Sequence, residues 1–95
     1  MHARVTYSKT DPRKAPERLR FIKERVAPTA SSREGFNAGY WMSDSATGKG
    51  LAITFWDSEE AMLASEGMEK NLVDKAIATN VEIAGIEHYE VIHSV

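Results

Sequence analysis

The part of the chain that most constrains its fold is the segment 36–56, which has the pattern of two strands joined by a turn. Residues 44–50 between the strands are rich in Asp, Ser and Gly, which favour the backbone conformations of tight turns. Both strands carry large apolar side chains on both faces, whereas the antiparallel sheet of a small soluble protein usually buries one face and exposes the other. Something must therefore cover each face of this hairpin.

The strands of the hairpin are expected at 36–43 and 51–56, and two further strands at 3–9 and 86–93. The first of the four alternates apolar and polar side chains, which predicts a half-buried strand. Its apolar face carries Ala3, Val5 and Tyr7, and its polar face carries Arg4, Thr6 and Ser8.

Two helices are expected between the strands. The first begins near Ala15, with Pro16 in its first turn, and ends at Pro28, because proline fits the start of a helix but disrupts its interior. The second follows Asp57, which we expect to cap it, and its apolar positions continue over about five turns. Residues 79–85 then form a connection to the last strand.

The resulting element order is β-α-β-β-α-β within 95 residues. This order predicts one ferredoxin-like α+β domain over residues 1–95, with a four-stranded antiparallel sheet and both helices on one face. We expect the helices to cover the more aliphatic face of the hairpin, which carries Leu51, Ile53 and Phe55. The opposite face, with Trp41 and Trp56, then needs another cover, because exposed tryptophans on a sheet usually mark a partner or a ligand.

Composition excludes several classes of function. The chain has no cysteine, which rules out disulfides, thiol catalysis and thiolate metal sites and fits a cytoplasmic protein. Neither a signal-peptide pattern nor an apolar run long enough for a membrane span is present in the sequence. A basic cluster is interleaved with glutamates, so we expect a solvated helix face and no nucleic-acid partner. The cluster consists of Arg13, Lys14, Arg18, Arg20, Lys23 and Arg25.

Three segments of the chain resemble a known family. They are EGFNAGYW at 34–41, GKGLAITFWDSEEAMLASE at 48–66 and IEHYEV at 86–91. With the length and element order, they resemble the dimeric α+β barrel superfamily and, within it, small bacterial proteins related to the antibiotic biosynthesis monooxygenases. The resemblance implies a homodimer in which two sheets pack face to face across a twofold axis. A small domain gains useful burial from such a partner.

The superfamily includes monooxygenases that work without metal or flavin, haem-degrading enzymes and lactone isomerases, and the fold alone does not choose among them. The haem-degrading branch has an asparagine on its first strand and a tryptophan and a histidine on its second helix. Here Tyr7 occupies the comparable strand region, and residues 58–79 contain neither Trp nor His. The resemblance therefore points to the oxygenase branch, which implies no cofactor and an apolar pocket for a small aromatic or polyphenolic substrate.

Such an oxygenase needs an apolar cavity, a group that stabilises a substrate anion and room for dioxygen. The candidate catalytic residues are Tyr7, Asn37 and His88, and the candidate ligand-binding residues are Tyr40, Trp41, Trp56 and Met62. Each also has a structural interpretation, as core or interface packing for the aromatic residues and as strand hydrogen bonding for the polar ones. No metal site is expected, because His88 and His93 point to opposite faces of one strand and only His2 remains.

The sequence thus leads to three hypotheses. The first is a homodimeric, cofactor-independent, monooxygenase-like protein that acts on a small aromatic molecule. The second is a non-catalytic module that binds an apolar small molecule in the same pocket. The third is a purely structural homodimer, whose aromatic side chains form the interface between its two sheets. None of the three involves a membrane.

Overall fold

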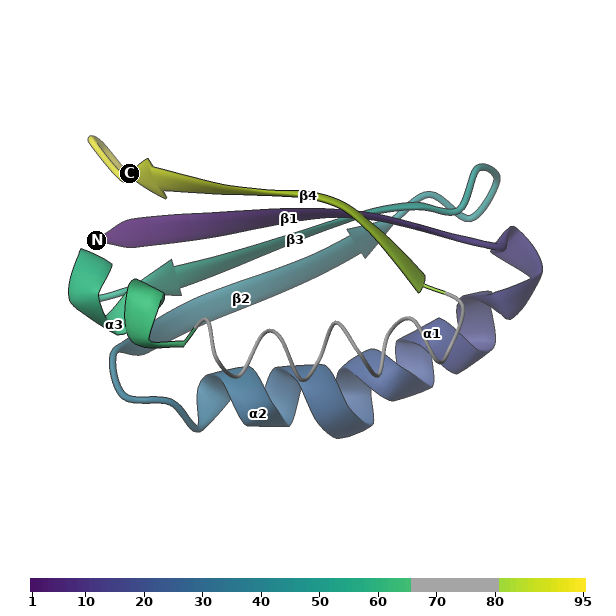
Figure 1. Cartoon of the computed structure of the whole chain (residues 1–95), viewed down its shortest axis with the longest axis horizontal. Coiled ribbons are helices and arrows are strands. Elements are labelled where there is room, and N and C mark those ends of the chain that lie inside the picture. The colour runs from purple at the N-terminus through teal and green to yellow at the C-terminus, as the bar shows by residue number, and fades with distance from the viewer. Residues whose placement is uncertain (66–80) are drawn as a thin grey trace.

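The computed structural model describes residues 1–65 and 81–95. Four antiparallel strands form one sheet in the order β2-β3-β1-β4 (Figure 1). They are β1 (His2–Thr10), β2 (Phe36–Ser43), β3 (Lys49–Trp56) and β4 (Val81–Glu90). β1 pairs with both β3 and β4, so the first strand of the chain lies at the centre of the sheet. This is the ferredoxin-like topology that the element order predicted.

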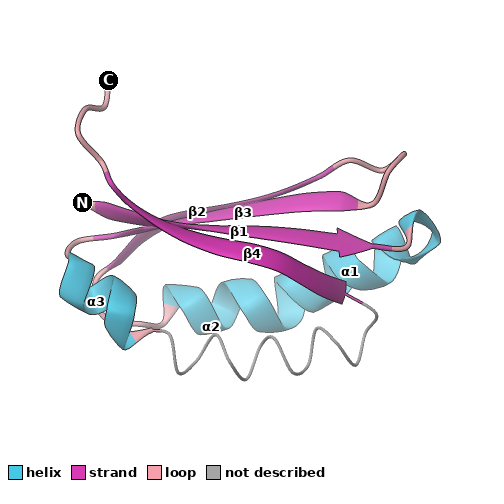
Figure 2. Ribbon diagram, turned by 45° about the horizontal axis from the view of Figure 1, so that its top comes forward, coloured by secondary structure: helices cyan, strands magenta, loops and turns pink. Residues whose placement is uncertain are grey.

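The helical segments lie on one face of the sheet (Figures 1 and 2). Between β1 and β2 the chain forms η1, a 3-10 turn (Pro12–Lys14), then α1 (Ala15–Phe21), the π-helical segment η2 (Ile22–Val26) and α2 (Ala27–Ser31). After β3 it forms α3 (Glu59–Ala64). The predicted α+β fold is confirmed, and the part of the second helix expected over 66–78 lies outside the described residues.

The first helix continues past Pro28, although the sequence predicted that it would end there. Pro28 lies in the first turn of α2, directly after the π-helical segment η2. The backbone N–H of Ala27 donates to the carbonyl of Ile22, five residues earlier, so this turn is wider than an α-helical turn. The wider turn gives the proline ring space that the interior of an α-helix does not provide. Pro28 therefore coincides with a change of helix type and does not end the helix.

The start of α3 also differs from the prediction by one residue. Ser58 caps the helix, because its Oγ accepts a hydrogen bond from the N–H of Ala61 at 3.1 Å. Asp57, the expected cap, instead accepts a hydrogen bond from Nδ2 of Asn37 at 2.5 Å. Asp57 therefore links the end of β3 to the start of β2, and Ser58 caps α3.

Two strands begin earlier than predicted. β3 begins at Lys49, which pairs with Lys9, and β4 begins at Val81, which pairs with Thr10. The expected connection over 79–85 is therefore wrong for residues 81–85, because pairing with the long central strand recruits them into the sheet. β4 ends at Glu90, three positions before the predicted end at residue 93.

The helices cover the tryptophan face of the hairpin, so the predicted choice of face is wrong. Trp56 has no exposed surface, and its ring meets Phe36 edge-on with 5.5 Å between the ring centroids. The Arg4 guanidinium lies over the Trp56 ring and donates to the carbonyl of Met62, a buried residue of α3. Trp41 shares this side, because it lines a groove together with helix residues.

The opposite face of the sheet carries no helix from the described part of the chain (Figure 2). Its side chains include the acidic Glu87 and the apolar or aromatic Ala3, Val5, Tyr7, Ala38, Tyr40, Met42, Leu51, Ile53, Phe55 and Tyr89. We call this surface the open face. Both faces of the hairpin are apolar, so its own pattern did not distinguish them. The polar side of β1 decides the orientation, because Arg4 and Ser8 find hydrogen-bond partners in the helices.

Candidate functional site

The sheet face that meets the helices carries a row of polar side chains on its central strand. This polar row consists of His2, Arg4, Thr6, Ser8 and Thr10. The row shares its side of the sheet with Trp56, which lies directly opposite His2. A sheet face packed on helices is normally apolar, because burying polar groups costs free energy unless they are hydrogen-bonded. Partners within the protein meet this cost for Arg4, which donates to the carbonyl of Met62, and for Ser8, which accepts from Arg18.

Arg4 follows His2 in the polar row. Its side chain is only 3% exposed, and its Nη2 donates to the carbonyl of Met62. The guanidinium lies 5.7 Å from the centroid of the Trp56 ring, a cation–π arrangement that contributes roughly 0.5–2 kcal/mol depending on burial. Nε1 of Trp56 donates to Oγ1 of Thr54 at 3.0 Å. Both the ring face and the N–H of this indole are thus held in place.

Trp41 lies in a groove between the edge strand β2 and the first helix. The groove has a volume of about 490 Å³ and is lined by Lys23, Ala27, Pro28, Ser31, Phe36, Gly39 and Trp41. Its walls are mostly apolar, as is usual in small-molecule sites. Gly39 leaves space for the rings, since a Cβ there would lie 2.6 Å from Cη2 of Trp41 and 3.3 Å from Cζ of Phe36. Trp41, Phe36 and Trp56 therefore form an aromatic row on the helix side of the hairpin.

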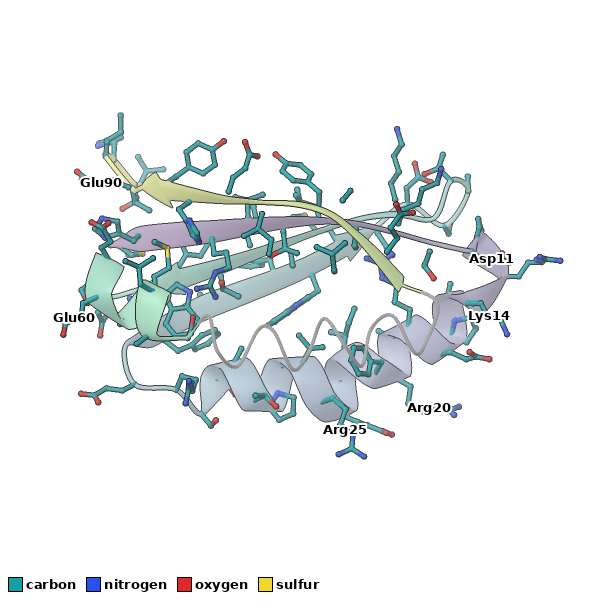
Figure 3. The ribbon with its side chains drawn as sticks, in the orientation of Figure 1. Asp11, Lys14, Arg20, Arg25, Glu60 and Glu90 are labelled. Atoms are coloured by element: carbon teal, nitrogen blue, oxygen red, sulfur yellow. The ribbon has the colours of Figure 1, made fainter. Side chains whose placement is uncertain are left out.

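Arg18 also turns toward the sheet, although the sequence placed it in a solvated basic cluster. Its Nη2 donates to Oγ of Ser8 at 2.6 Å, and its Nη1 donates to the carbonyl of Gly48 at 3.3 Å. Burial lowers the pKa of this guanidinium. Arg20 and Arg25 of the same cluster are exposed and point away from the sheet (Figure 3). The solvated-face prediction is therefore wrong for Arg18.

The predicted site residues divide between the two faces of the sheet. Trp41, Trp56, Met62 and His88 lie on the helix side, where His88 is directly opposite Arg4 and is exposed. Tyr7 and Tyr40 lie on the open face, and Asn37 lies in a bulge at the start of β2. A ligand that contacts the tryptophans is therefore separated from both tyrosines by the sheet. The roles assigned to these residues stay predictions.

Tyr7 belongs to a second polar cluster, on the open face. Oη of Tyr89 donates to Oε2 of Glu87 at 2.9 Å, and Tyr7 lies on the same face, on the neighbouring strand β1. The hydrogen bonds to Glu87 raise the pKa of both tyrosines above the ordinary value for a phenol. Both phenols therefore keep their protons near neutral pH and are poor general bases.

Sequence reasoning did not single out Arg4, Ser8, Thr54 or Arg18 as site residues. A signal existed for the first two, because the alternation of β1 placed them on one face with Thr6. The missing information was which sheet face meets the helices, since the strand pattern is equally compatible with either orientation. Arg18 had no local signal, because its neighbours along the helix are also basic.

Within residues 1–65 and 81–95, no three His, Cys, Asp or Glu side chains are placed to bind one metal ion together. Likewise, none of the helices described is both long and apolar enough to span a bilayer.

Several solved structures share this arrangement of sheet and helices. A candidate antibiotic biosynthesis monooxygenase from Deinococcus radiodurans has a TM-score of 0.77 at 20% identity, over 100% of this chain and 96% of that chain. The monooxygenase of the ActVA-Orf6 gene of Streptomyces coelicolor, solved with nanaomycin D, has a TM-score of 0.73 at 13% identity, over 99% and 89%. SnoaB, a cofactor-independent oxygenase from Streptomyces nogalater, has a TM-score of 0.72 at 11% identity, over 99% and 95%. The chain has the antibiotic biosynthesis monooxygenase fold.

The antibiotic biosynthesis monooxygenase fold confirms the resemblance seen in the segments 34–41, 48–66 and 86–91. No protein-family model and no curated protein matches the sequence. At identities of 20% and below, the structural likeness establishes the fold. The activity has to be argued from the side chains of this chain.

Proposed function

We propose that the protein binds a small aromatic or polyphenolic molecule between its sheet and its helices and oxygenates it without a metal or flavin cofactor. The observation that carries this proposal is the groove lined by Trp41 and Phe36, with the buried Trp56 packed against Phe36 and the polar row of β1 on the same side of the sheet. Aromatic side chains stack on flat ligands, while guanidinium and hydroxyl groups donate hydrogen bonds to ligand oxygens. The fold supports the proposal, since SnoaB is a cofactor-independent oxygenase.

In a reaction of this class the substrate itself supplies the electrons. A ring CH₂ group next to a conjugated carbonyl system loses a proton, and the resulting carbanion reduces dioxygen. The CH₂ group becomes a C=O group and the second oxygen atom leaves as water, so no other reductant is needed. The protein's part is to orient the substrate and stabilise its anion. Of the three candidate catalytic residues, only His88 lies on the helix side of the sheet.

Oxygen consumption by the purified, metal-free protein tests this proposal. With anthrones, which contain such a CH₂ group, as substrates, we expect uptake above the protein-free rate. Trp41→Ala removes a wall of the groove and should reduce the uptake. Tyr40→Phe on the open face is the matched control and should leave it unchanged. If no member of a broad panel is consumed faster than without protein, the protein is not an oxygenase of this class.

The second candidate function is a non-catalytic module that binds the same kind of molecule. It is favoured by the polar groups that contact the helices, because Arg4, Ser8 and Arg18 offer hydrogen-bond donors and none of them is a usual general base of an enzyme. Native mass spectrometry of freshly purified protein would detect a retained ligand. Retention without oxygen uptake would select this function over catalysis.

We also infer that a second copy of the chain covers the open face. Tyr40 and Met42 are 59% and 45% exposed and lie beside Ile53 and Leu51. A continuous apolar surface of this kind is uncommon on a monomer, and a twofold axis brings the same surface of a second copy against it. Trp41 and Trp56 lie on the other side of the sheet, so the purely structural hypothesis does not account for them. A cytoplasmic location stays a prediction of the cysteine-free sequence.

A further inference from the structure

We propose that Arg18 and Ser8 form an anion-binding subsite that selects aromatic ligands carrying a carboxylate. This inference rests on the proposed function, because it assigns a substrate class to the same space between sheet and helices. Arg18 reaches this space from α1, and Ser8 reaches it from the polar row of β1. The two side chains are joined by the 2.6 Å hydrogen bond from Nη2 to Oγ.

The guanidinium of Arg18 packs against the sheet at Gly50. A Cβ at Gly50 would lie 1.6 Å from Nη2 and 2.5 Å from Cζ of Arg18, and 2.6 Å from Oγ of Ser8. Any side chain at this position would therefore displace the arginine from the sheet. The second hydrogen bond, from Nη1 to the carbonyl of Gly48, fixes the other terminal nitrogen of the guanidinium. The position of Arg18 thus depends on a residue of β3 with no side chain.

The charge of this guanidinium is not balanced by a carboxylate in the described part of the chain. Both of its hydrogen-bond acceptors, a hydroxyl and a backbone carbonyl, are neutral. The pKa of the Arg18 guanidinium is lowered, and burial is the one cause of this shift. By comparison, Arg13 pairs with Asp11 at 2.8 Å. A partly buried cation without a counter-ion is costly, and a bound anion removes that cost.

Donors for an anion remain available after these contacts. A guanidinium has five N–H donors, and Arg18 uses two of them in hydrogen bonds with residues in the described part of the chain. Oγ of Ser8 accepts from Arg18, so its own hydroxyl hydrogen is left to donate. Trp41 lies opposite Ala52 of β3, two positions from Gly50 and so about 7 Å along the sheet at the usual rise of a strand. A ligand with its rings in the Trp41 groove would bring a terminal carboxylate to Arg18.

Binding of a matched pair of probes tests the proposal independently of any oxygenase activity. The probes are 2-naphthoate and 2-naphthamide, which share their rings and differ in charge, titrated into the full-length protein and followed by backbone amide NMR shifts. We expect the wild type to prefer the carboxylate about tenfold, in the range of a charge-assisted hydrogen bond. The amide signals of Ser8 and Gly50 should shift with the carboxylate.

Three variants separate the subsite from other effects. Arg18→Gln should bring the ratio of the affinities for the carboxylate and the amide close to one. It should leave the affinity for the amide unchanged. Gly50→Ala keeps the positive charge but displaces it, and should lose the preference in the same way. Arg20→Gln is the matched control, because this exposed arginine of the same helix makes the same change in net charge (Figure 3). It should retain the wild-type preference, and thermal melting of each variant confirms folding.

Three results would overturn the proposal. They are equal binding of the two probes by the wild type, the same loss of preference in Arg20→Gln, and no binding of either probe. Oxygen uptake that persists while Arg18→Gln shows an unchanged preference would reject the subsite and keep the proposed function. If Arg18→Gln loses the preference for the carboxylate and the protein never consumes oxygen, the subsite is kept and the proposed function is rejected.

Discussion

Trp56 is the largest fully buried side chain in the described part of the chain. It is fully buried, its ring lies between Phe36 and the Arg4 guanidinium, and its N–H is bonded to Thr54. Truncating a buried tryptophan usually costs about 3–5 kcal/mol. We therefore expect Trp56→Ala to lower the free energy of unfolding by about that amount, measured by urea denaturation.

Trp41→Ala is the matched control for this experiment. Trp41 lines an open groove and keeps part of its surface exposed. Its truncation should therefore cost clearly less than that of Trp56. Equal losses would mean that the two indoles are buried alike, which contradicts the structure.

The cluster of Tyr7, Glu87 and Tyr89 predicts a change in tyrosine titration. Hydrogen bonds to Glu87 raise the pKa of both phenols, so their protons are held more tightly in the folded than in the unfolded protein. The stability that this difference provides is complete below the ordinary phenol pKa of about 10 and is lost as the pH rises through the folded-state values.

Glu87→Gln should lower the midpoint of phenolate formation at 295 nm. The comparison is made in a Tyr40→Phe background, which leaves Tyr7 and Tyr89 as the two tyrosines that absorb. The substitution removes the negative charge, so both phenols should ionise at lower pH. Identical titration curves would show that the carboxylate does not control the two tyrosines.

At the scale of elements, the cap of α3 distinguishes two adjacent residues. Ser58 accepts the N–H of Ala61, whereas Asp57 accepts from Asn37. Ser58→Ala should therefore lower the free energy of unfolding by about 1 kcal/mol, the usual effect of losing an N-cap. Chemical denaturation measures it, with Ser45→Ala in an exposed turn as the control. If Ser45→Ala lowers the free energy of unfolding as much as Ser58→Ala does, loss of the cap is not the cause of the Ser58→Ala effect.

The order and type of the elements could be predicted from the sequence because each depends on local pattern. β2 was located to the residue, since a glycine-rich turn limits one end and a polar loop the other. The end of the first helix could not be predicted, because Pro28 is accommodated by a π-helical turn that leaves no mark in the sequence. The cap at Ser58 was missed because Asp57 is an equally good capping residue.

For the whole molecule, the open face predicts how two copies associate. Phe55 and Ile53 lie on this face beside Ala3 and Val5, and a charge among them would be buried by a second copy. Phe55→Asp should therefore convert a dimer into a monomer of 10.6 kDa. Light scattering coupled to size-exclusion chromatography measures the mass.

Leu19→Asp is the control for the dimer experiment. Leu19 is 53% exposed on α1, on the helical side of the molecule, and it should leave the mass unchanged. If the wild type is already monomeric at high micromolar concentration, the open face has another cover. If both variants dissociate equally, the interface includes the helices.

The candidate site was only partly predictable, because it depends on which sheet face meets the helices. Trp41, Trp56 and Met62 were identified from their size and apolar character, and all three lie on the helix side. The partners that orient them come from distant parts of the chain, as with Arg4 and Met62, which are 58 positions apart. No local pattern predicts such a contact.

The alternation of β1 also determines how this protein can change over evolutionary time. Thr6 and Ser8 face the helices, while Val5 and Tyr7 face the open side, so neighbours in the chain belong to different surfaces. Under the proposed function and dimer, substitutions at the first pair would alter which molecule is recognised and leave the surface between two copies intact. Substitutions at the second pair would do the opposite. A combinatorial library confined to the polar row would then change ligand preference without loss of quaternary structure.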